Sequence, residues 1–135
     1  MALRTVCLDT DVLIDHLRGD EETIRRIEKL EDEGKILSTT TVNSFELYYG
    51  AKKTGKREKN VEAVRRLLDK LVVLEFDGRS AEKAGELAAR LESEGNSIGF
   101  RDIFIGSTVI TNDVELLSKN VRHFEKIHEL KLRTM

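Results

Sequence analysis

The chain has 135 residues and a formal net charge of −2 at pH 7. A chain of this length buries roughly two thirds of the surface that its unfolded form exposes, so we expect a single domain over residues 1–135. The near balance of charges excludes a polycationic protein. Any contact with nucleic acid would therefore depend on local basic patches or on bound metal ions.

Cysteine content and hydropathy predict a soluble, cytoplasmic protein. Cys7 is the single cysteine, so no internal disulfide can form, and its place in an apolar run predicts a small buried hydrophobic residue. The amino terminus has no signal-peptide core, and no run of about 18 apolar residues is free of charge.

Short apolar runs alternate with helical periodicities along the chain. The first run, residues 5–8, precedes a helical pattern that carries Val12, Leu13 and Leu17. Further strands are predicted at residues 36–39, 72–76, 115–118 and 130–132. Further helices are predicted after Asp20, after a cap at Thr41, over 61–71, from Ser80, over 102–112 and over 121–124. This alternation predicts a three-layer α/β/α fold with a central parallel sheet of four to five strands.

Four polar residues stand at or shortly after the ends of predicted strands: Asp9, Glu46, Asp102 and Asn120. In open parallel sheets, ligands bind beyond the carboxyl ends of the strands. Hard divalent cations such as Mg²⁺ prefer oxygen ligands, and one to three carboxylates suffice when substrate phosphates supply the rest. Nucleases use such sites to activate a water molecule and to neutralise the leaving oxygen.

Two of these acids also have a structural interpretation. Asp9 and Asp102 each precede or begin a predicted helix, where a carboxylate is a good N-cap. Glu46 is harder to explain in this way, because it lies between Phe45 and Leu47 in a run of large side chains. A charged group in such surroundings is costly to desolvate unless it is paired or binds a metal.

Other candidate ligands are weak. His16, His123 and His128 share no zinc-ligand spacing with Cys7, and we interpret them as surface or partly packed side chains. Asp113 lies 11 residues past Asp102, about 16 Å along a continuous helix, so we exclude it from the site.

Four segments together resemble the PIN-domain nucleases of the VapC toxin type. They are Leu8-Asp9-Thr10-Asp11-Val12-Leu13-Ile14-Asp15, Thr41-Val42-Asn43-Ser44-Phe45-Glu46-Leu47-Tyr48-Tyr49-Gly50, Gly99-Phe100-Arg101-Asp102-Ile103-Phe104-Ile105-Gly106 and Leu117-Ser118-Lys119-Asn120-Val121-Arg122-His123-Phe124. The resemblance covers nearly the whole chain. It implies an Mg²⁺- or Mn²⁺-dependent endoribonuclease that cuts cellular RNA, works as a homodimer and is silenced by a small VapB-type antitoxin.

The resemblance also implies roles for single residues. Asp9 and Asp102 would be the principal metal ligands, Glu46 would hold a metal or its water, and Asn120 would orient a metal-bound water. Ser118 stands where the family usually has a threonine and would lend a hydroxyl beside the site. Asn120 replaces an aspartate of some relatives, and an amide offers an oxygen without a charge. We therefore expect a second ion to arrive only with RNA.

Charged and aromatic residues near these motifs have two interpretations each. Asp11 and Asp15 are expected to cap the first helix and to pair with Arg18. Alternatively, Asp11 could contact a residue that itself binds the metal. A basic run is interpreted as a solvated loop or, alternatively, as a guide for the RNA backbone. A set of aromatic residues is expected to be buried or to form a dimer contact, and could alternatively stack on bases. The basic run consists of Lys52, Lys53, Lys56, Arg57 and Lys59. The aromatic set consists of Phe45, Tyr48 and Tyr49.

Three other functions remain open. A haloacid-dehalogenase-like phosphatase would use Asp9 as nucleophile and Asp11 as general acid. It would also need a lysine, a late acidic pair and a longer chain, and the late candidate here is a lone Asp113. A phosphoacceptor receiver domain would use Asp77, and it leaves Glu46 and Asp102 unexplained. A PIN fold could also bind RNA or a partner without catalysis.

Overall fold

A five-stranded sheet lies at the centre of the computed structural model, which describes residues 4–135. All four strand pairings are parallel, and the strand order is β3-β2-β1-β4-β5. The strands are β1 (Thr5–Leu8), β2 (Ile36–Thr40), β3 (Val72–Leu74), β4 (Glu115–Leu117) and β5 (Lys131–Arg133). The predicted central parallel sheet is confirmed, at the upper end of the expected number of strands.

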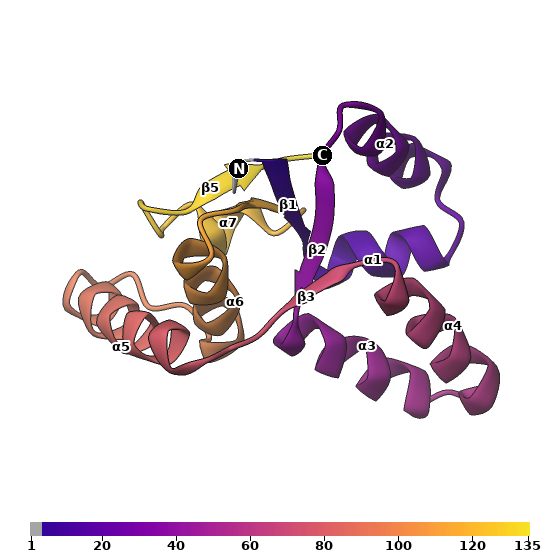
Figure 1. Cartoon of the computed structure of the whole chain (residues 1–135). Coiled ribbons are helices and arrows are strands. Elements are labelled where there is room, and N and C mark those ends of the chain that lie inside the picture. The colour runs from indigo at the N-terminus through magenta and orange to yellow at the C-terminus, as the bar shows by residue number, and fades with distance from the viewer. Residues whose placement is uncertain (1–3) are drawn as a thin grey trace.

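Helices cover both faces of this sheet, as predicted (Figure 1). One side carries α1 (Thr10–Leu17), α2 (Glu21–Asp32), α3 (Thr41–Lys52) and α4 (Arg57–Asp69). The other carries α5 (Gly78–Ser93), α6 (Phe100–Thr111) and the short α7 (Val121–Phe124). Among residues 4–135, no helix combines the length and apolarity that a membrane crossing requires.

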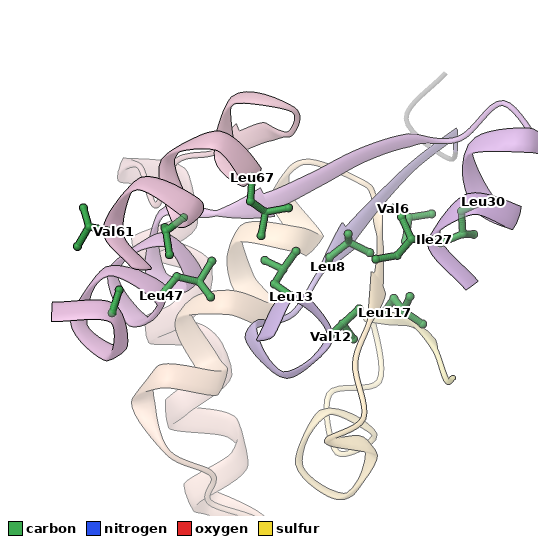
Figure 2. Close-up of a cluster of buried hydrophobic side chains, with 12 residues drawn as sticks. Val6, Leu8, Val12, Leu13, Ile27, Leu30, Leu47, Val61, Leu67 and Leu117 are labelled. Atoms are coloured by element: carbon green, nitrogen blue, oxygen red, sulfur yellow. The ribbon is translucent and has the colours of Figure 1, made fainter. Parts of the chain in front are cut away.

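Alternation along β1 builds the two cores. Val6 and Leu8 face the cluster formed with α1 to α4, whereas Cys7 faces the cluster formed with α5 and α6. Figure 2 shows the first cluster, in which Leu13 and Leu47 bring α1 and α3 together. Cys7 is fully buried, as expected, and burial raises the pKa of its thiol, so it packs as a small hydrophobic residue.

Several helix starts differ from the sequence prediction by one to three residues. Thr40, not Thr41, caps α3 by accepting a hydrogen bond from the backbone of Asn43. Asp77, not Ser80, caps α5, and Ser80 donates the backbone N–H to it. In each case the earlier residue has an extended backbone, and its side chain accepts a hydrogen bond from a backbone N–H of the first helical turn. Likewise, α6 begins at Phe100 with Gly99 as its cap, so Asp102 lies within the first turn and is not the cap.

The strand order fixes where a site can form. The chain adds β2 and β3 on one side of β1 and then crosses to add β4 and β5 on the other. The connections that leave β1 and β4 consequently run in opposite directions from the carboxyl ends of these two neighbouring strands. Open α/β sheets usually bind their ligands in the crevice at such a point. Asp9 follows β1 and Ser118 follows β4, so both lie at this edge.

Candidate active site

Asp9 is held rigidly at the end of the central strand. Its carboxylate is 1% exposed, and its Oδ1 accepts hydrogen bonds from the Thr10 backbone at 2.8 Å and from Asn43 Nδ2 at 2.9 Å. Its Oδ2 accepts from the Ser118 hydroxyl at 2.7 Å. These donors offset the cost of burying the charge and fix the orientation of both oxygens.

Ser118 lies beside Asp9, directly after β4. The residue is fully buried, and its hydroxyl also accepts the backbone N–H of Asn120 at 2.9 Å. One hydroxyl thus joins the ends of β1 and β4 through Asp9 and orders the start of the loop that carries Asn120.

Asn43 is a site residue that the sequence prediction missed. It is fully buried in the first turn of α3, where its amide oxygen accepts from the backbone and hydroxyl of Thr40, completing a capping box. Its amide nitrogen donates to Asp9 and, at 2.8 Å, to the Thr10 hydroxyl. A capping-box pattern, Thr40 followed three residues later by Asn43, was the available signal.

Glu46 reaches the same point from the second turn of α3. Its side chain is 27% exposed, and its Oε1 accepts a short hydrogen bond from the Thr10 hydroxyl. The expectation that the charge of Glu46 is compensated holds, because the guanidinium of Arg101 donates to both of its oxygens, at 2.8 and 2.9 Å.

Asp102 enters from the first turn of α6 and is 5% exposed. Its Oδ2 lies 2.8 Å from His123 Nδ1 and 3.5 Å from the amide nitrogen of Asn120. Asn120 thus lies beside Asp102, with its amide directed at that carboxylate. His123, which the sequence suggested only as a surface or partly packed side chain, is half exposed yet directly contacts this carboxylate.

Arg101 connects the three carboxylates. Besides its bonds to Glu46, its Nη2 lies 2.9 Å from Asp9 Oδ1 and its Nη1 lies 2.6 Å from Asp102 Oδ1. Desolvation opposes the charge of Arg101, but hydrogen bonds to Glu46 and the nearby charge of Asp9 outweigh it and raise the pKa of the guanidinium. Arg101 therefore stays a cation at every physiological pH.

This arrangement gathers hard oxygen donors. Asp9, Glu46 and Asp102 each place at least one oxygen within hydrogen-bonding distance of one guanidinium, so their negative charge converges on one point. Among residues 4–135, no three acidic, histidine or cysteine side chains are already close enough together to ligate one ion. The Arg101 guanidinium stands between the carboxylates, and their chemistry suits a divalent cation such as Mg²⁺ or Mn²⁺.

The structure places Asp113 away from the three carboxylates. Asp113 has φ 52° at the other end of β4, and its carboxylate pairs with Lys131 at 3.0 Å. The five basic residues Lys52, Lys53, Lys56, Arg57 and Lys59 are all exposed. Lys52 belongs to α3, and Arg57 and Lys59 belong to α4, so only Lys53 and Lys56 lie in the predicted loop.

Two interpretations of residues beside the site need correction. The carboxylate of Asp15 pairs with Lys119 instead of the expected Arg18, and Asp11 accepts the backbone N–H of Lys119 at 3.0 Å. Phe45 and Tyr49 are 64% and 55% exposed and stack on each other, which excludes burial within this chain and leaves the dimer contact or base stacking.

Comparison with known proteins identifies a family that this chain matches. A family model described as PIN domain matches residues 6–130. Ribonuclease VapC2 of Haemophilus influenzae is 27% identical over 92% of this chain and 92% of its own length. Ribonuclease VapC10 of Mycobacterium tuberculosis is 32% identical over 93% of this chain and 90% of its own.

A solved structure agrees with these relatives. The structure of VapBC2 from Rickettsia felis bound to a promoter DNA fragment includes a chain that superposes with a TM-score of 0.89 at 25% identity. The superposition covers 97% of this chain and 98% of that one. The chain therefore belongs to the PIN domain family and, within it, to the VapC-type ribonucleases.

Proposed function

We propose that this chain is a divalent-metal-dependent endoribonuclease, the toxin of a VapBC-type toxin–antitoxin pair. The observation that carries the proposal is the convergence of Asp9, Glu46 and Asp102 on one point at the carboxyl edge of the sheet. Relatives named as ribonucleases cover more than nine tenths of the chain and support the same reaction class.

Asp9 and Asp102 would hold the metal, with Glu46 as a third ligand or as the acceptor for a metal-bound water. Oxygen donors alone favour Mg²⁺, for which Mn²⁺ commonly substitutes. When bound, such an ion lowers the pKa of a water molecule and stabilises the charge on the leaving oxygen. RNA phosphate oxygens would complete its coordination.

The chain's own residues prepare this site. Ser118 and Asn43 orient the Asp9 carboxylate, and His123 and Asn120 contact Asp102 on the side away from Arg101. We propose that Asn120 acts through this contact and by orienting water, because its amide adds no charge that would attract a second ion.

The test is RNA cleavage by protein purified free of any antitoxin. We expect cleavage with Mg²⁺ or Mn²⁺, none after chelation, and at least a hundredfold loss in Asp9→Asn, because that change removes the charge of a principal metal ligand. Asp113→Asn is the matched control, since it makes the same change in an acid at the opposite end of β4.

Two results would contradict the proposal. Equal cleavage by Asp9→Asn and the parent would show that the nuclease activity does not depend on this site. A stable phosphoryl group trapped on Asp9 would instead favour the phosphatase alternative, although the burial of Asp9 and the engagement of both of its oxygens argue against a nucleophile.

A protein partner belongs to the proposal as well. The VapBC structures are complexes of related toxins with their antitoxins, and we propose that a VapB-type antitoxin silences this chain. An open groove of about 310 Å³ runs between α1, α3 and α4, and apolar residues line most of it. They include Ile14, Leu17, Leu47, Ala51 and Val64, with Glu46 of the active site at the rim. A short antitoxin segment in this groove would end beside the carboxylates.

We also retain a homodimer as a proposal. The stacked rings of Phe45 and Tyr49 give the exposed side of α3 an apolar surface that a second copy could cover.

A further inference from the structure

Arg101 makes the densest set of ionic contacts of the active site. Four of its donor contacts reach three different carboxylates, at distances between 2.6 and 2.9 Å. Asp9 and Asp102 are both nearly buried, so water offers little alternative solvation for their charges. The guanidinium therefore supplies the cation that these two carboxylates require when no metal is bound.

The same three carboxylates are those that the proposed function assigns to the metal. Asp9 Oδ1, Asp102 Oδ1 and both oxygens of Glu46 point at the guanidinium. A divalent ion at that point would face a fixed positive charge a few ångströms away, and it would need lone pairs that already accept hydrogen bonds. Binding of an ion through these oxygens and the present position of Arg101 are thus mutually exclusive.

We propose that Arg101 is an internal counter-cation that competes with the divalent metal for Asp9, Glu46 and Asp102. This inference rests on the proposed function, because it takes the metal site from there. Metal binding then requires the Arg101 side chain to move. This requirement lowers the affinity of the RNA-free protein for the ion.

The structure provides a place for the displaced side chain. Arg101 is 33% exposed and lines an open cavity of about 470 Å³ together with Phe45, Phe76 and Phe104. A change of rotamer would carry the guanidinium into this cavity without altering the backbone of α6. There it would lie against aromatic rings, which attract cations by their quadrupole.

The test measures Mn²⁺ binding to RNA-free protein by calorimetry, independently of catalysis. Arg101→Met keeps an unbranched side chain and removes the charge, so we expect the Kd for Mn²⁺ to fall about tenfold or more relative to the parent. Arg101→Lys keeps one charge with fewer donors and should give a smaller decrease. Arg122→Met, an exposed arginine at the start of α7, is the matched control and should leave the Kd within about twofold of the parent.

Thermal unfolding gives a second readout. Without metal, Arg101→Met leaves buried carboxylates uncompensated, so its melting temperature should lie below that of the parent. Saturating Mn²⁺ should then raise the melting temperature more in Arg101→Met than in the parent. If Arg101→Met does not fold without metal, the Arg101→Lys variant decides through its Kd.

An unchanged or higher Kd in Arg101→Met or Arg101→Lys would overturn the competition. If the parent nevertheless binds Mn²⁺ and cleaves RNA, only this inference fails. If neither the parent nor the Arg101 variants bind Mn²⁺ and the parent does not cleave RNA, the proposed function itself fails.

Discussion

At the scale of the residue, the orientation of the proposed metal ligands depends on the side chains around them. Three neutral donors hold the carboxylate of Asp9: the Thr10 backbone, Asn43 and Ser118. Neutral donors leave the negative charge on the carboxylate available to a cation. Arg101 is the exception, since it brings a full positive charge to the same oxygens.

Ser118 provides a test of this orientation. Ser118→Ala removes the hydrogen bond to Asp9 Oδ2, and we expect RNA cleavage to fall about tenfold, as is typical when a partner of a metal ligand is lost. Ser118→Thr restores a hydroxyl and should recover most of the activity. Steady-state cleavage rates over a series of Mg²⁺ concentrations measure both variants, and melting curves check that they fold.

A fully active Ser118→Ala variant would show that Asp9 keeps its orientation without this hydroxyl. Weak activity that rises with the Mg²⁺ concentration would instead locate the defect in metal affinity, which agrees with a positioning residue.

At the scale of the element, α5 is joined to the edge of the sheet by polar contacts as well as by apolar packing. Glu129 lies in the loop before β5, where it forms a bidentate pair with Arg90 at 2.6 and 3.1 Å and a second ion pair with Lys83 at 3.0 Å. Both cations belong to α5. This network ties α5 to the edge of the sheet, beside the core that α5 shares with α6.

The network predicts a pH dependence of stability. Hydrogen bonds from Arg90 above all lower the pKa of Glu129 to about 2, against the opposing effect of partial burial, with Lys83 adding to the lowering. A carboxylate with a lowered pKa stabilises the fold above its unfolded pKa, here 4.5, and loses this effect as the pH falls through 2. We expect Glu129→Gln to reduce the free energy of unfolding at pH 7 by about 1 kcal/mol, after allowance for solvent screening.

Urea denaturation at several pH values checks this prediction. The difference between Glu129→Gln and the parent should stay constant from pH 7 to about pH 4.5 and shrink below that. The control is Glu82→Gln, which makes the same change in an exposed acid of α5. A difference that does not change between pH 4.5 and the acid unfolding transition would contradict the assigned role of Glu129.

At the scale of the whole molecule, the strand order brings distant segments together. Because β1 lies between β2 and β4, the helices that leave β1 and β2 meet the amino terminus of α6 at one edge of the sheet. Asp9, Glu46 and Asp102 thus converge although 93 residues separate the first from the last. The receiver-domain alternative does not use this geometry, and Asp77, its acceptor, instead caps α5.

The groove between α1, α3 and α4 gives a prediction about the proposed antitoxin. Leu17 is 39% exposed at this groove, so Leu17→Asp places a charge where we expect an apolar antitoxin side chain. Affinity for the antitoxin should fall at least tenfold, measured by calorimetry with the purified pair. Ile36→Asp, which changes an apolar residue that is 49% exposed at the start of β2, should retain the affinity of the parent. Equal affinity of Leu17→Asp and the parent would exclude this groove as the docking site.

The sequence alone determined the class of fold and the acids of the candidate site. Apolar periodicity is local, so it indicates strands, helices and the residues that follow each strand, apart from caps displaced by one to three residues. The resemblance to VapC-type nucleases then assigned Asp9, Glu46, Asp102, Asn120 and Ser118 to one edge of the sheet.

Only the tertiary structure decided which side chains surround these acids. Arg101, Asn43 and His123 contact carboxylates that lie 92, 34 and 21 residues away along the chain. Such contacts depend on the order of the strands and on side-chain rotamers, and no local pattern encodes either. For the same physical reason, the sequence predicted the negative charge of the site, whereas the tertiary structure revealed the cation that already compensates it.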